Sequence, residues 1–436
     1  MEISKRFYTN NISEENIGKD VRIAGLITAV RKVSGKLLFI VLEDNSGKSQ
    51  VILSSDGVGK EALDTAQEYG FLDVIGRVQK SKSTVYPYEL YASNIISISS
   101  PKLQLPIDMI DNTTTSLDIR LKFRPIDLRR ECIRSIFRVQ SYLLEGIYEH
   151  LINNNFIQVF TPSILDKGND GGADVFKFKY FDKNAYLRQN PQLHKQLTIL
   201  GGFEKIFEIG HEWRADPSKT ARHISEHVDI TVEEAYVNDI EDLMDFEEDL
   251  IIAGIRKVLE KGDKDLKTLK KVVEIPKKPF PRIACAELDN LLRDSAEIIS
   301  EDRLSITGKA RLMNSKIREK YGSKFYFLTD YPFSDVPFYS MRDEENNSIT
   351  KNTYLICDGV GICSSGLREH RYKNLLRNIE DKGTKDTEWY TKFFEYGAPP
   401  HGGFSLGLER FTMQLLGLEN IREASLYPRD ANSIYL

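Results

Sequence analysis

The stretch from Phe207 to Tyr236 reads FEIGHEWRADPSKTARHISEHVDITVEEAY, and it predicts two strands joined by a polar loop. Apolar and polar residues alternate in both arms, as in strands with one face on a core. The opposite face and the loop would gather charged side chains, namely Arg214, Arg222, His223, Glu226 and Glu233. Such a surface suits an anionic ligand rich in hydrogen-bonding edges, for example a nucleotide triphosphate. Taken alone, the pattern is better explained by an exposed hairpin with solvated charges.

The 436-residue chain is long enough for two or three domains with ample cores. Its net charge of −5 excludes a global basic field, so a nucleic-acid partner would need local patches. The four cysteines form no CxxC pair, and no apolar run approaches the ~20 residues that cross a bilayer. No signal peptide is recognisable at MEISKRFYTN. We therefore expect a cytoplasmic protein with reduced thiols and no membrane partner.

Between about Asp20 and Ser100, five short β-branched runs are separated by turn residues, and a helical stretch follows the third run. This order predicts an OB-fold, a small barrel that often binds single-stranded nucleic acid. Its exposed face would offer Arg31, Phe39 and Gln50. An aromatic ring there can stack on an unpaired base, and an amide can read a base edge. The alternative for Phe39 is a place in the core, and spacing alone does not decide between the two.

Residues 105–130 are interpreted as a connector, because prolines and the segment DNTTTSLDIR argue against regular structure. Its basic run RLKFRPIDLRR suits either a solvated hinge or a contact with a nucleic-acid backbone. Periodicity then predicts a helix over about 132–154, followed by a strand, FIQVFTP. This pair could form a dimer contact or pack within its own domain.

The rest of the chain predicts a mixed α and β domain. Pro191 fits the first turn of a helix in which Gln192 and Lys195 share a face. A second amphipathic helix is expected over 239–261, and a charged helical insertion over about 262–320. Strands are expected at FYFLTDYP, PFYSMR and TYLICDGVGICSS. The glycine-rich HGGFSLGLER would be a strand entering a helix near Arg410, where flat backbone lets a ligand lie close.

Together these stretches resemble the class II aminoacyl-tRNA synthetases of the aspartate/asparagine subgroup, most closely the archaeal and eukaryotic type. FIQVFTP resembles the first motif of the family, which forms the dimer interface. The central hairpin, with WRAD and Arg222-His223, resembles the second motif, and GGFSLGLER the third. The resemblance implies an α+β architecture: an OB-fold anticodon-binding domain over 1–104, a hinge over 105–130, and a catalytic domain over 131–436 with an antiparallel sheet flanked by helices.

The resemblance also implies an ATP-dependent, AMP-forming ligase that makes aspartyl-adenylate and transfers aspartate to the 3′ end of tRNA. Lys195 and Arg368 match the residues that hold the substrate carboxylate, which favours aspartate over asparagine. Ser364, Asp170 and Gln192 match other amino-acid-binding positions. The positions that match ATP-binding residues are Arg214, Asp216, Arg222, His223, Glu226, His227 and Arg410, with Arg214 and Arg410 as the catalytic pair. Arg31, Phe39 and Gln50 match the anticodon-reading face.

Three positions depart from the family pattern. Gly361 stands where relatives carry a glutamate that binds Mg²⁺ with ATP, and glycine has no ligand atoms. Asp358, Glu233 or Asp229 could substitute. Thr231 stands where relatives carry an aspartate that helps to hold the substrate ammonium group, and Leu367 replaces a glutamine.

Three hypotheses follow. The first is a working homodimeric aspartate–tRNA ligase that uses ATP and Mg²⁺, with tRNA-Asp as its partner. The second is an asparaginyl enzyme, or one that charges both tRNA-Asp and tRNA-Asn; Lys195 counts against it. The third is a synthetase-like paralogue that no longer charges tRNA or that serves another acceptor. Gly361 and Thr231 support the third, whereas the complete set of Arg214, Arg410, Lys195 and Arg368 opposes it.

Overall fold

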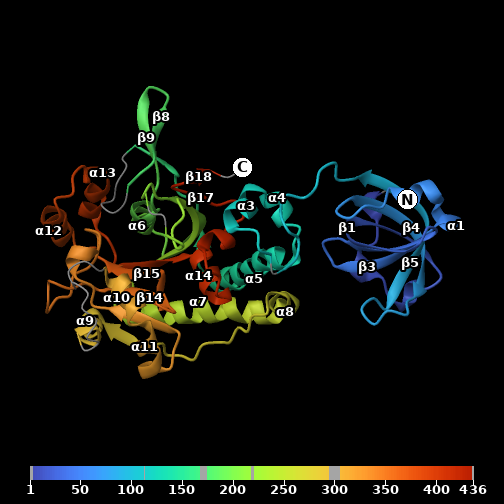
Figure 1. Cartoon of the computed structure of the whole chain (residues 1–436). Coiled ribbons are helices and arrows are strands. Elements are labelled where there is room, and N and C mark those ends of the chain that lie inside the picture. The colour runs from blue at the N-terminus through green and yellow to red at the C-terminus, as the bar shows by residue number, and fades with distance from the viewer. Residues whose placement is uncertain (1–2, 112, 167–173, 218–219, 294–304, 435–436) are drawn as a thin grey trace. The chain divides into compact units, whose positions relative to one another are not determined.

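The computed structural model describes residues 3–111, 113–166, 174–217, 220–293 and 305–434. The chain forms two compact units, Met1–Pro106 and Ile107–Leu436, drawn in Figure 1. Each unit has its own hydrophobic core. The boundary at Pro106 lies two residues beyond the end expected for the first domain.

The first unit is a closed five-stranded barrel, which confirms the predicted OB-fold. Its strands are β1 (Asp20–Ser34), β2 (Leu37–Glu43), β3 (Lys48–Ser54), β4 (Phe71–Lys80) and β5 (Tyr88–Ser99). They are hydrogen-bonded in the order β1-β2-β3-β5-β4, and the pairing of β4 with β1 closes the barrel. The predicted helical stretch is present after the third strand as α1 (Ser55–Val58) and α2 (Lys60–Asp64).

Strand β2 shows which residues form the barrel core. Leu38, Ile40 and Leu42 are buried inside, and Phe39 between them is half-buried on the other face. The alternative that Phe39 belongs to the core is therefore wrong. Arg31 pairs with Phe39 across β1 and β2, and its guanidinium lies 5.0 Å from the ring centroid.

The second unit is built on an eight-stranded sheet in the order β12-β13-β14-β15-β16-β11-β10-β6. Neighbouring strands from β13 to β10 are antiparallel, whereas β12 and β6 join the two edges in parallel. The strand bounds are β6 (Ile157–Gln158), β10 (Lys205–Trp213), β11 (Glu226–Ala235), β12 (Arg282–Ala284), β13 (Phe325–Thr329), β14 (Asn352–Cys357), β15 (Val360–Arg368) and β16 (His401–Gly407). A smaller three-stranded sheet comprises β7 (Ile164–Leu165), β9 (Lys183–Leu187) and β8 (Lys177–Tyr180), in that order. A two-stranded sheet pairs β17 (Arg429–Asp430) with β18 (Ser433–Ile434).

Two long helices, α5 (Glu131–Asn153) and α7 (Ile240–Lys261), lie side by side in Figure 1. Their apolar faces form one core with sheet residues such as Phe207, Ile230 and Phe404. Both helices match their predicted ranges to within a residue. The remaining α-helices of this unit among the described residues are α3 (Leu117–Lys122), α4 (Arg124–Asp127), α6 (Gln192–Leu200), α8 (Asp263–Leu269), α9 (Cys285–Arg293), α10 (Ile306–Leu312), α11 (Asn314–Tyr321), α12 (Tyr372–Lys382), α13 (Glu388–Thr391) and α14 (Leu408–Leu416).

The connector differs from its prediction. Residues after Pro106 belong to the second unit, and α3 and α4 give the supposedly irregular segment regular structure. Arg124 and Arg130 of the basic run are buried, and both donate hydrogen bonds to Asp127 at 2.9 Å. A buried cation needs a buried partner, which Asp127 supplies. These two arginines are therefore part of the core of the second unit, and neither is available to a nucleic-acid backbone.

Three further predictions change in detail. PFYSMR forms no strand and makes only isolated bridges, such as Ser340 with Arg368. TYLICDGVGICSS is two strands, β14 and β15, because Asp358 and Gly359 adopt positive φ angles of 46° and 77° and turn the chain back. The insertion over 262–320 is largely helical where it is described, but it also supplies β12 to the sheet edge.

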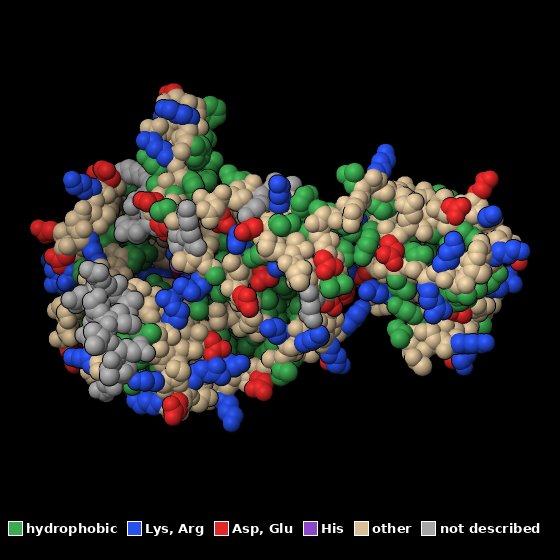
Figure 2. Space-filling model, in the orientation of Figure 1, with side chains coloured by type: hydrophobic (Ala, Val, Ile, Leu, Met, Phe, Trp, Pro, Cys, Tyr) green, Lys and Arg blue, Asp and Glu red, His purple; other side chains and the backbone are tan. Residues whose placement is uncertain are grey.

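Charged side chains of both signs are interspersed over the face of each unit shown in Figure 2, in keeping with the net charge of −5. Within the described ranges, no helix has the length and apolar character to cross a membrane.

Candidate active site

A cavity of about 490 Å³ opens within the second unit. Strands β10, β11, β14, β15 and β16 and the start of α14 all contribute to its wall, so the sheet order determines which residues meet there. Its described lining includes polar and charged residues, namely Gln189, Asn190, Gln192, Glu212, Arg214, Asp216, Arg222, His223, His227, Asp229, Asp335, Asn352, Ser364, Arg368, Ser405, Glu409 and Arg410.

The hairpin β10–β11 forms the centre of the cavity wall. Its apolar residues Phe207, Ile230 and Val232 enter the core beneath α5 and α7. The polar residues of the other face are buried as well: Glu212 is 1% exposed and Glu233 0%. An exposed hairpin with solvated charges is therefore the wrong interpretation, because β16 covers one side of β11 and the cavity encloses the polar face.

One part of the cavity is cationic. Arg214 follows β10, Arg222 and His223 lie in the hairpin loop, and Arg410 lies on the first turn of α14. Burial lowers the pKa of Arg410, and the nearby Arg214 lowers it further. Burial also lowers the pKa of His223, followed by the charges of Arg410 and Arg222. Cations that lie close enough to repel one another are stabilised by a bound anion, so this region suits phosphate groups.

A buried ionic cluster adjoins a second part of the cavity, where two of its members, Arg368 and Gln192, form the wall. Nε of Arg368 donates to Oε1 of Glu233 at 2.8 Å, and Nζ of Lys195 lies 3.3 Å from Oε2 of Glu233. Gln192 bridges the group: its Nε2 donates to Glu233 at 3.0 Å, and its Oε1 accepts from Arg368 at 3.2 Å. A Cβ at Gly403 would clash with Glu233 and with the carbonyl of Val232, so a glycine is needed at that position.

The cluster keeps an excess of positive charge. Burial alone would raise the pKa of Glu233, but Arg368 and Lys195 outweigh it and lower that pKa to about 2. Burial lowers the pKa of Lys195, and Glu233 opposes this effect. With all three charged, two cations face one carboxylate, and a further carboxylate entering the cavity would balance the group. Arg368 and Gln192 are the cluster residues that line the cavity, whereas Lys195 and Glu233 lie outside its lining. Lys195 also donates to the carbonyl of Val232 at 3.1 Å.

The structure brings most of the predicted site residues to this cavity. Those that line it are Arg214, Asp216, Arg222, His223, His227, Arg410, Gln192, Ser364, Arg368 and Gly361. Glu226 pairs with Trp213 at the mouth of the hairpin and is not part of the lining. Asp170 lies outside the described residues.

Two of the three predicted substitutes for a magnesium ligand, Asp358 and Glu233, lie outside the cavity lining. Gly361 lines the cavity but offers no ligand atom, and Arg410 donates to its carbonyl at 3.2 Å. Asp358 lies in the β14–β15 turn, outside the lining, where it pairs with Arg318 at 3.0 Å. Glu233 is held by Arg368 and Lys195. Gly361 therefore contributes no side-chain ligand at the expected position, and of the three proposed substitutes only Asp229 lines the cavity.

Sequence reasoning overlooked Glu212, Glu409 and Tyr339. Glu212 had a detectable signal, because it lies two residues before Arg214 on the same strand face. Tyr339 had none: it comes from a segment without regular structure, and its ring centroid lies 5.8 Å from the guanidinium of Arg368. Burial raises the pKa of Glu409 to about 7, although it accepts hydrogen bonds from the backbone N–H of Val228.

Comparisons with known proteins give a consistent result. Residues 116–431 match the family model of class II tRNA synthetases (D, K and N), and residues 21–98 match the OB-fold nucleic-acid-binding domain. The aspartate–tRNA(Asp) ligase of Pyrococcus abyssi is 37% identical over 97% of this chain and 98% of its own length. The aspartate–tRNA(Asp/Asn) ligase of Aeropyrum pernix is 34% identical over 99% of both chains. Among solved structures, asparaginyl-tRNA synthetase from Pyrococcus horikoshii with asparaginyl-adenylate superposes with a TM-score of 0.90 at 27% identity, covering 99% of this chain and 100% of that one.

Proposed function

From the premise that the chain belongs to the class II tRNA synthetases of the D, K and N group, we propose that it is an aspartate–tRNA ligase. It activates aspartate with ATP to aspartyl-adenylate and then transfers aspartate to the 3′ end of tRNA. The observation that carries the choice of amino acid is the buried cluster of Arg368, Lys195 and Glu233. Its formal charge is positive, so it favours the side-chain carboxylate of aspartate over the neutral amide of asparagine.

The cavity supplies the charges that the first step needs. The α-carboxylate of aspartate attacks the α-phosphate of ATP, the bond to the β-phosphate breaks, and pyrophosphate leaves. Arg214 would neutralise the α-phosphate as its charge increases, and Arg222 and His223 would hold the outer phosphates. Such in-line chemistry depends on positioning and charge neutralisation more than on a dedicated acid or base.

Other residues would orient the two substrates. Arg410 and His227 line the cavity, where they would enclose the adenine ring, and cation–π and ring stacking support this role. Gln192 and Ser364 would contact the amino-acid backbone. Burial lowers the pKa of His227 to about 4, so its imidazole is neutral at pH 7 and can stack. In the second step the 3′-terminal adenosine hydroxyl attacks the adenylate carbonyl, and AMP leaves.

The chain's tRNA-binding domain is the N-terminal OB-fold, and tRNA is the partner that both matched domains support. Arg31, Phe39 and Gln50 would read the anticodon from the outer barrel face. Gln50 donates to Glu89 at 2.5 Å, which fixes the orientation of its amide. A homodimer through the first motif is supported by two exposed apolar side chains, Ile157 at 52% and Phe160 at 79%.

Two alternatives have specific support. Some relatives are named Asp/Asn ligases, and the amino-acid pocket does not determine which tRNA is bound, so charging of tRNA-Asn as well as tRNA-Asp is compatible with this site. A paralogue without charging activity is supported by Gly361 and Thr231. Thr231 is buried and its hydroxyl donates to the carbonyl of Glu208 at 3.4 Å, so it offers no carboxylate to a substrate ammonium group.

The test is ATP–pyrophosphate exchange with aspartate or asparagine, with Mg²⁺ present and a panel of purified tRNAs. Exchange with aspartate alone is the expected result. Exchange with asparagine at a similar rate would overturn the assignment of the pocket. No exchange with either amino acid, in protein that still binds ATP, would favour the paralogue. Aminoacylation of tRNA-Asp and tRNA-Asn then separates the discriminating enzyme from one that charges both.

A further inference from the structure

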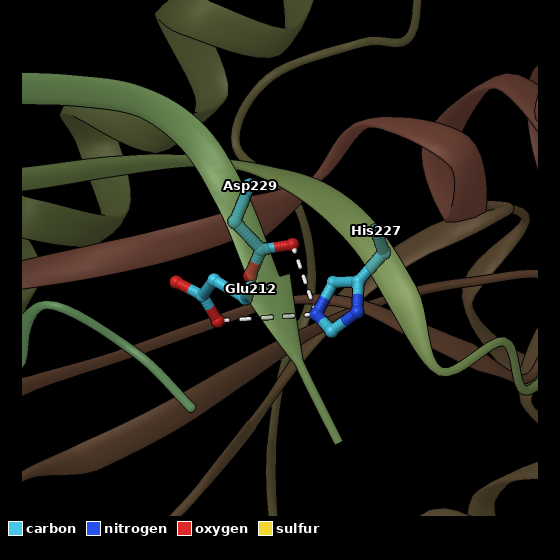
Figure 3. Close-up of side chains that lie close together, drawn as sticks. All are labelled: Glu212, His227 and Asp229. Atoms are coloured by element: carbon cyan, nitrogen blue, oxygen red, sulfur yellow. Dashed lines mark ion pairs between the residues drawn. The ribbon is translucent and has the colours of Figure 1, made fainter. Parts of the chain in front are cut away.

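Three donor groups that the proposed mechanism does not require as a set meet in the wall of the cavity. Glu212 on β10 lies directly opposite His227 on β11, and Asp229 follows two residues after His227 on the same face. Opposed residues on antiparallel strands, and residues two apart along a strand, bring their side chains to one surface. Figure 3 shows one ring nitrogen of His227 facing the carboxylates of both Asp229 and Glu212.

The distances are compatible with one metal ion. Nε2 of His227 lies 3.5 Å from Oδ1 of Asp229 and 3.8 Å from Oε2 of Glu212. One ligand atom from each residue can be chosen so that all three lie within 4.8 Å of one another. Ligand atoms about 2.0–2.2 Å from a shared ion lie roughly 3–4 Å apart, so small rotations of these side chains would complete the shell.

A second observation points to a missing ligand. Glu212 is 1% and Asp229 6% exposed, yet Oε1 of Glu212 and Oδ1 of Asp229 have no hydrogen-bond partner among the described residues. Buried carboxylate oxygens without partners are costly, and two adjacent carboxylates also repel each other. The other oxygen of Asp229 accepts from Ser405 at 2.6 Å, the kind of outer contact that orients a metal-binding carboxylate.

We propose that Glu212, His227 and Asp229 form a divalent-metal site that takes Mn²⁺ or Zn²⁺ in preference to Mg²⁺. Imidazole is a good ligand for first-row transition metals, whereas Mg²⁺ prefers an all-oxygen, near-octahedral shell and retains its waters. The site lies on β10 and β11, apart from Gly361 on β15. Binding of the ion does not depend on the proposed function. A role of the ion in neutralising the phosphates of ATP does rest on the proposed function.

The test measures binding of Mn²⁺ alone to the full chain after removal of metals by chelation, by titration calorimetry and by the electron-paramagnetic signal of free Mn²⁺. The wild type is expected to bind one ion per chain, with excess Mg²⁺ a weak competitor and Zn²⁺ a strong one. Asp229→Asn and His227→Gln should weaken binding at least about tenfold. Asp335→Asn, which alters another carboxylate of the cavity lining, is the matched control and should bind normally.

A second measurement uses the wild-type protein and so avoids any folding defect in the variants. Diethyl pyrocarbonate modifies neutral imidazoles, and peptide mass spectrometry can locate the product on each histidine. Bound Mn²⁺ should protect His227, with the six other histidines of the chain as internal references.

Several outcomes would overturn the proposal. One is the absence of Mn²⁺ binding in folded protein. Another is binding that none of the cluster variants weakens, or that leaves His227 unprotected. A third is a loss of aspartate affinity in Asp229→Asn without any metal binding, which would make the cluster a site for the substrate ammonium group. If the wild-type protein binds Mn²⁺ but shows no pyrophosphate exchange, the proposed function is contradicted and the metal site is not.

Discussion

Nε of Arg368 donates to Oε1 of Glu233 at 2.8 Å across 135 residues of sequence, and both side chains are buried. Arg368 comes from β15 and Glu233 from β11, which are both hydrogen-bonded to β16 between them. Glu233 holds the arginine in place and cancels one of the two positive charges contributed by Arg368 and Lys195. The polarity of the cavity at this point therefore depends on a balance among three buried groups.

Replacement of Lys195 with methionine tests that balance. The variant keeps much of the side-chain volume but leaves Arg368 and Glu233 as a neutral pair, so the cluster loses its excess positive charge. We expect aspartate activation in pyrophosphate exchange to fall at least about 100-fold, as when one partner of a buried charge contact is removed. ATP affinity should change less than about twofold, because Lys195 lies in the ionic cluster and not among the phosphate-facing arginines.

Lys205→Met is the matched control for this variant. Lys205 lies on β10, is half exposed, and pairs with Glu234 at 2.7 Å on the surface. Lys205→Met should leave aspartate activation and ATP affinity unchanged, because exposed ion pairs contribute little to stability. An equal loss of ATP and aspartate binding in Lys195→Met would indicate a folding defect and contradict the role of Lys195 in selecting the carboxylate.

Glu247 on α7 predicts a pH dependence of stability. The side chain is buried, and burial raises its pKa to about 7, an effect that Ser365 and Cys363 only partly offset. A carboxyl whose pKa is raised by folding favours the folded state fully below about pH 4.5, and this contribution is lost as the pH rises through 7. Glu247→Gln removes the titrating group and should be more stable than the wild type at pH 8 by about 3 kcal/mol, using 1.36 kcal/mol per pKa unit.

Urea unfolding at pH 5 and pH 8 measures this difference. The two proteins should differ by less than about 1 kcal/mol at pH 5, where the wild-type carboxyl is protonated in the folded state but already partly ionised in the unfolded chain. Glu149→Gln, a change on the exposed side of α5, is the control and should show no such divergence. A constant difference at both pH values would mean that Glu247 does not titrate in this range.

Phe39→Ala tests the outer face of the barrel. Loss of a base-stacking ring costs about 1–3 kcal/mol, so the KM for tRNA should rise roughly 5- to 100-fold. Pyrophosphate exchange without tRNA should be unchanged, because Phe39 belongs to the first unit and the cavity to the second. Phe71→Ala, which removes another partly exposed ring of the barrel, is the control. An unaltered KM for tRNA would remove Phe39 from the anticodon-binding face.

Gly361→Glu introduces a carboxylate at the position where the family resemblance implies one. A Cβ at this position would meet Ile356, Thr307 and Tyr354 at 3.6–3.7 Å, which are ordinary contact distances, so the fold should tolerate it. The added oxygen ligands suit Mg²⁺, and the Mg²⁺ concentration for half-maximal exchange should fall about tenfold. Gly361→Gln has the same shape without the charge and should not reproduce the effect. If Gly361→Glu and Gly361→Gln need the same Mg²⁺ concentration for half-maximal exchange, another group already supplies the negative charge that binds Mg²⁺.

Much of the fold could be predicted because its signals are local. The alternation of apolar residues in β10 and β11 and the amphipathic periods of α5 and α7 identified these elements to within a few residues. The five strands of the barrel were found in the same way. The prediction for residues 105–130 was wrong because the prolines and polar residues suggested irregular structure. In the fold, the burial of Arg124 against Asp127 holds α3 and α4 in place. The strand predicted at PFYSMR is absent because its apolar residues pack as a loop and form no β-ladder with a neighbouring strand.

The sequence by itself determined the type and order of the elements, the two domains, and the residues that match known motifs, because each depends on the spacing of neighbours along the chain. Only the tertiary structure decided that Lys195 and Arg368 both pair with Glu233, that Asp358 faces Arg318, and that Glu212 joins His227 and Asp229. These relationships depend on strand order and register, which bring residues from distant segments into contact across hydrogen-bonded neighbours. The period of a strand predicts which face a side chain occupies, but the partner on that face is set by the sheet.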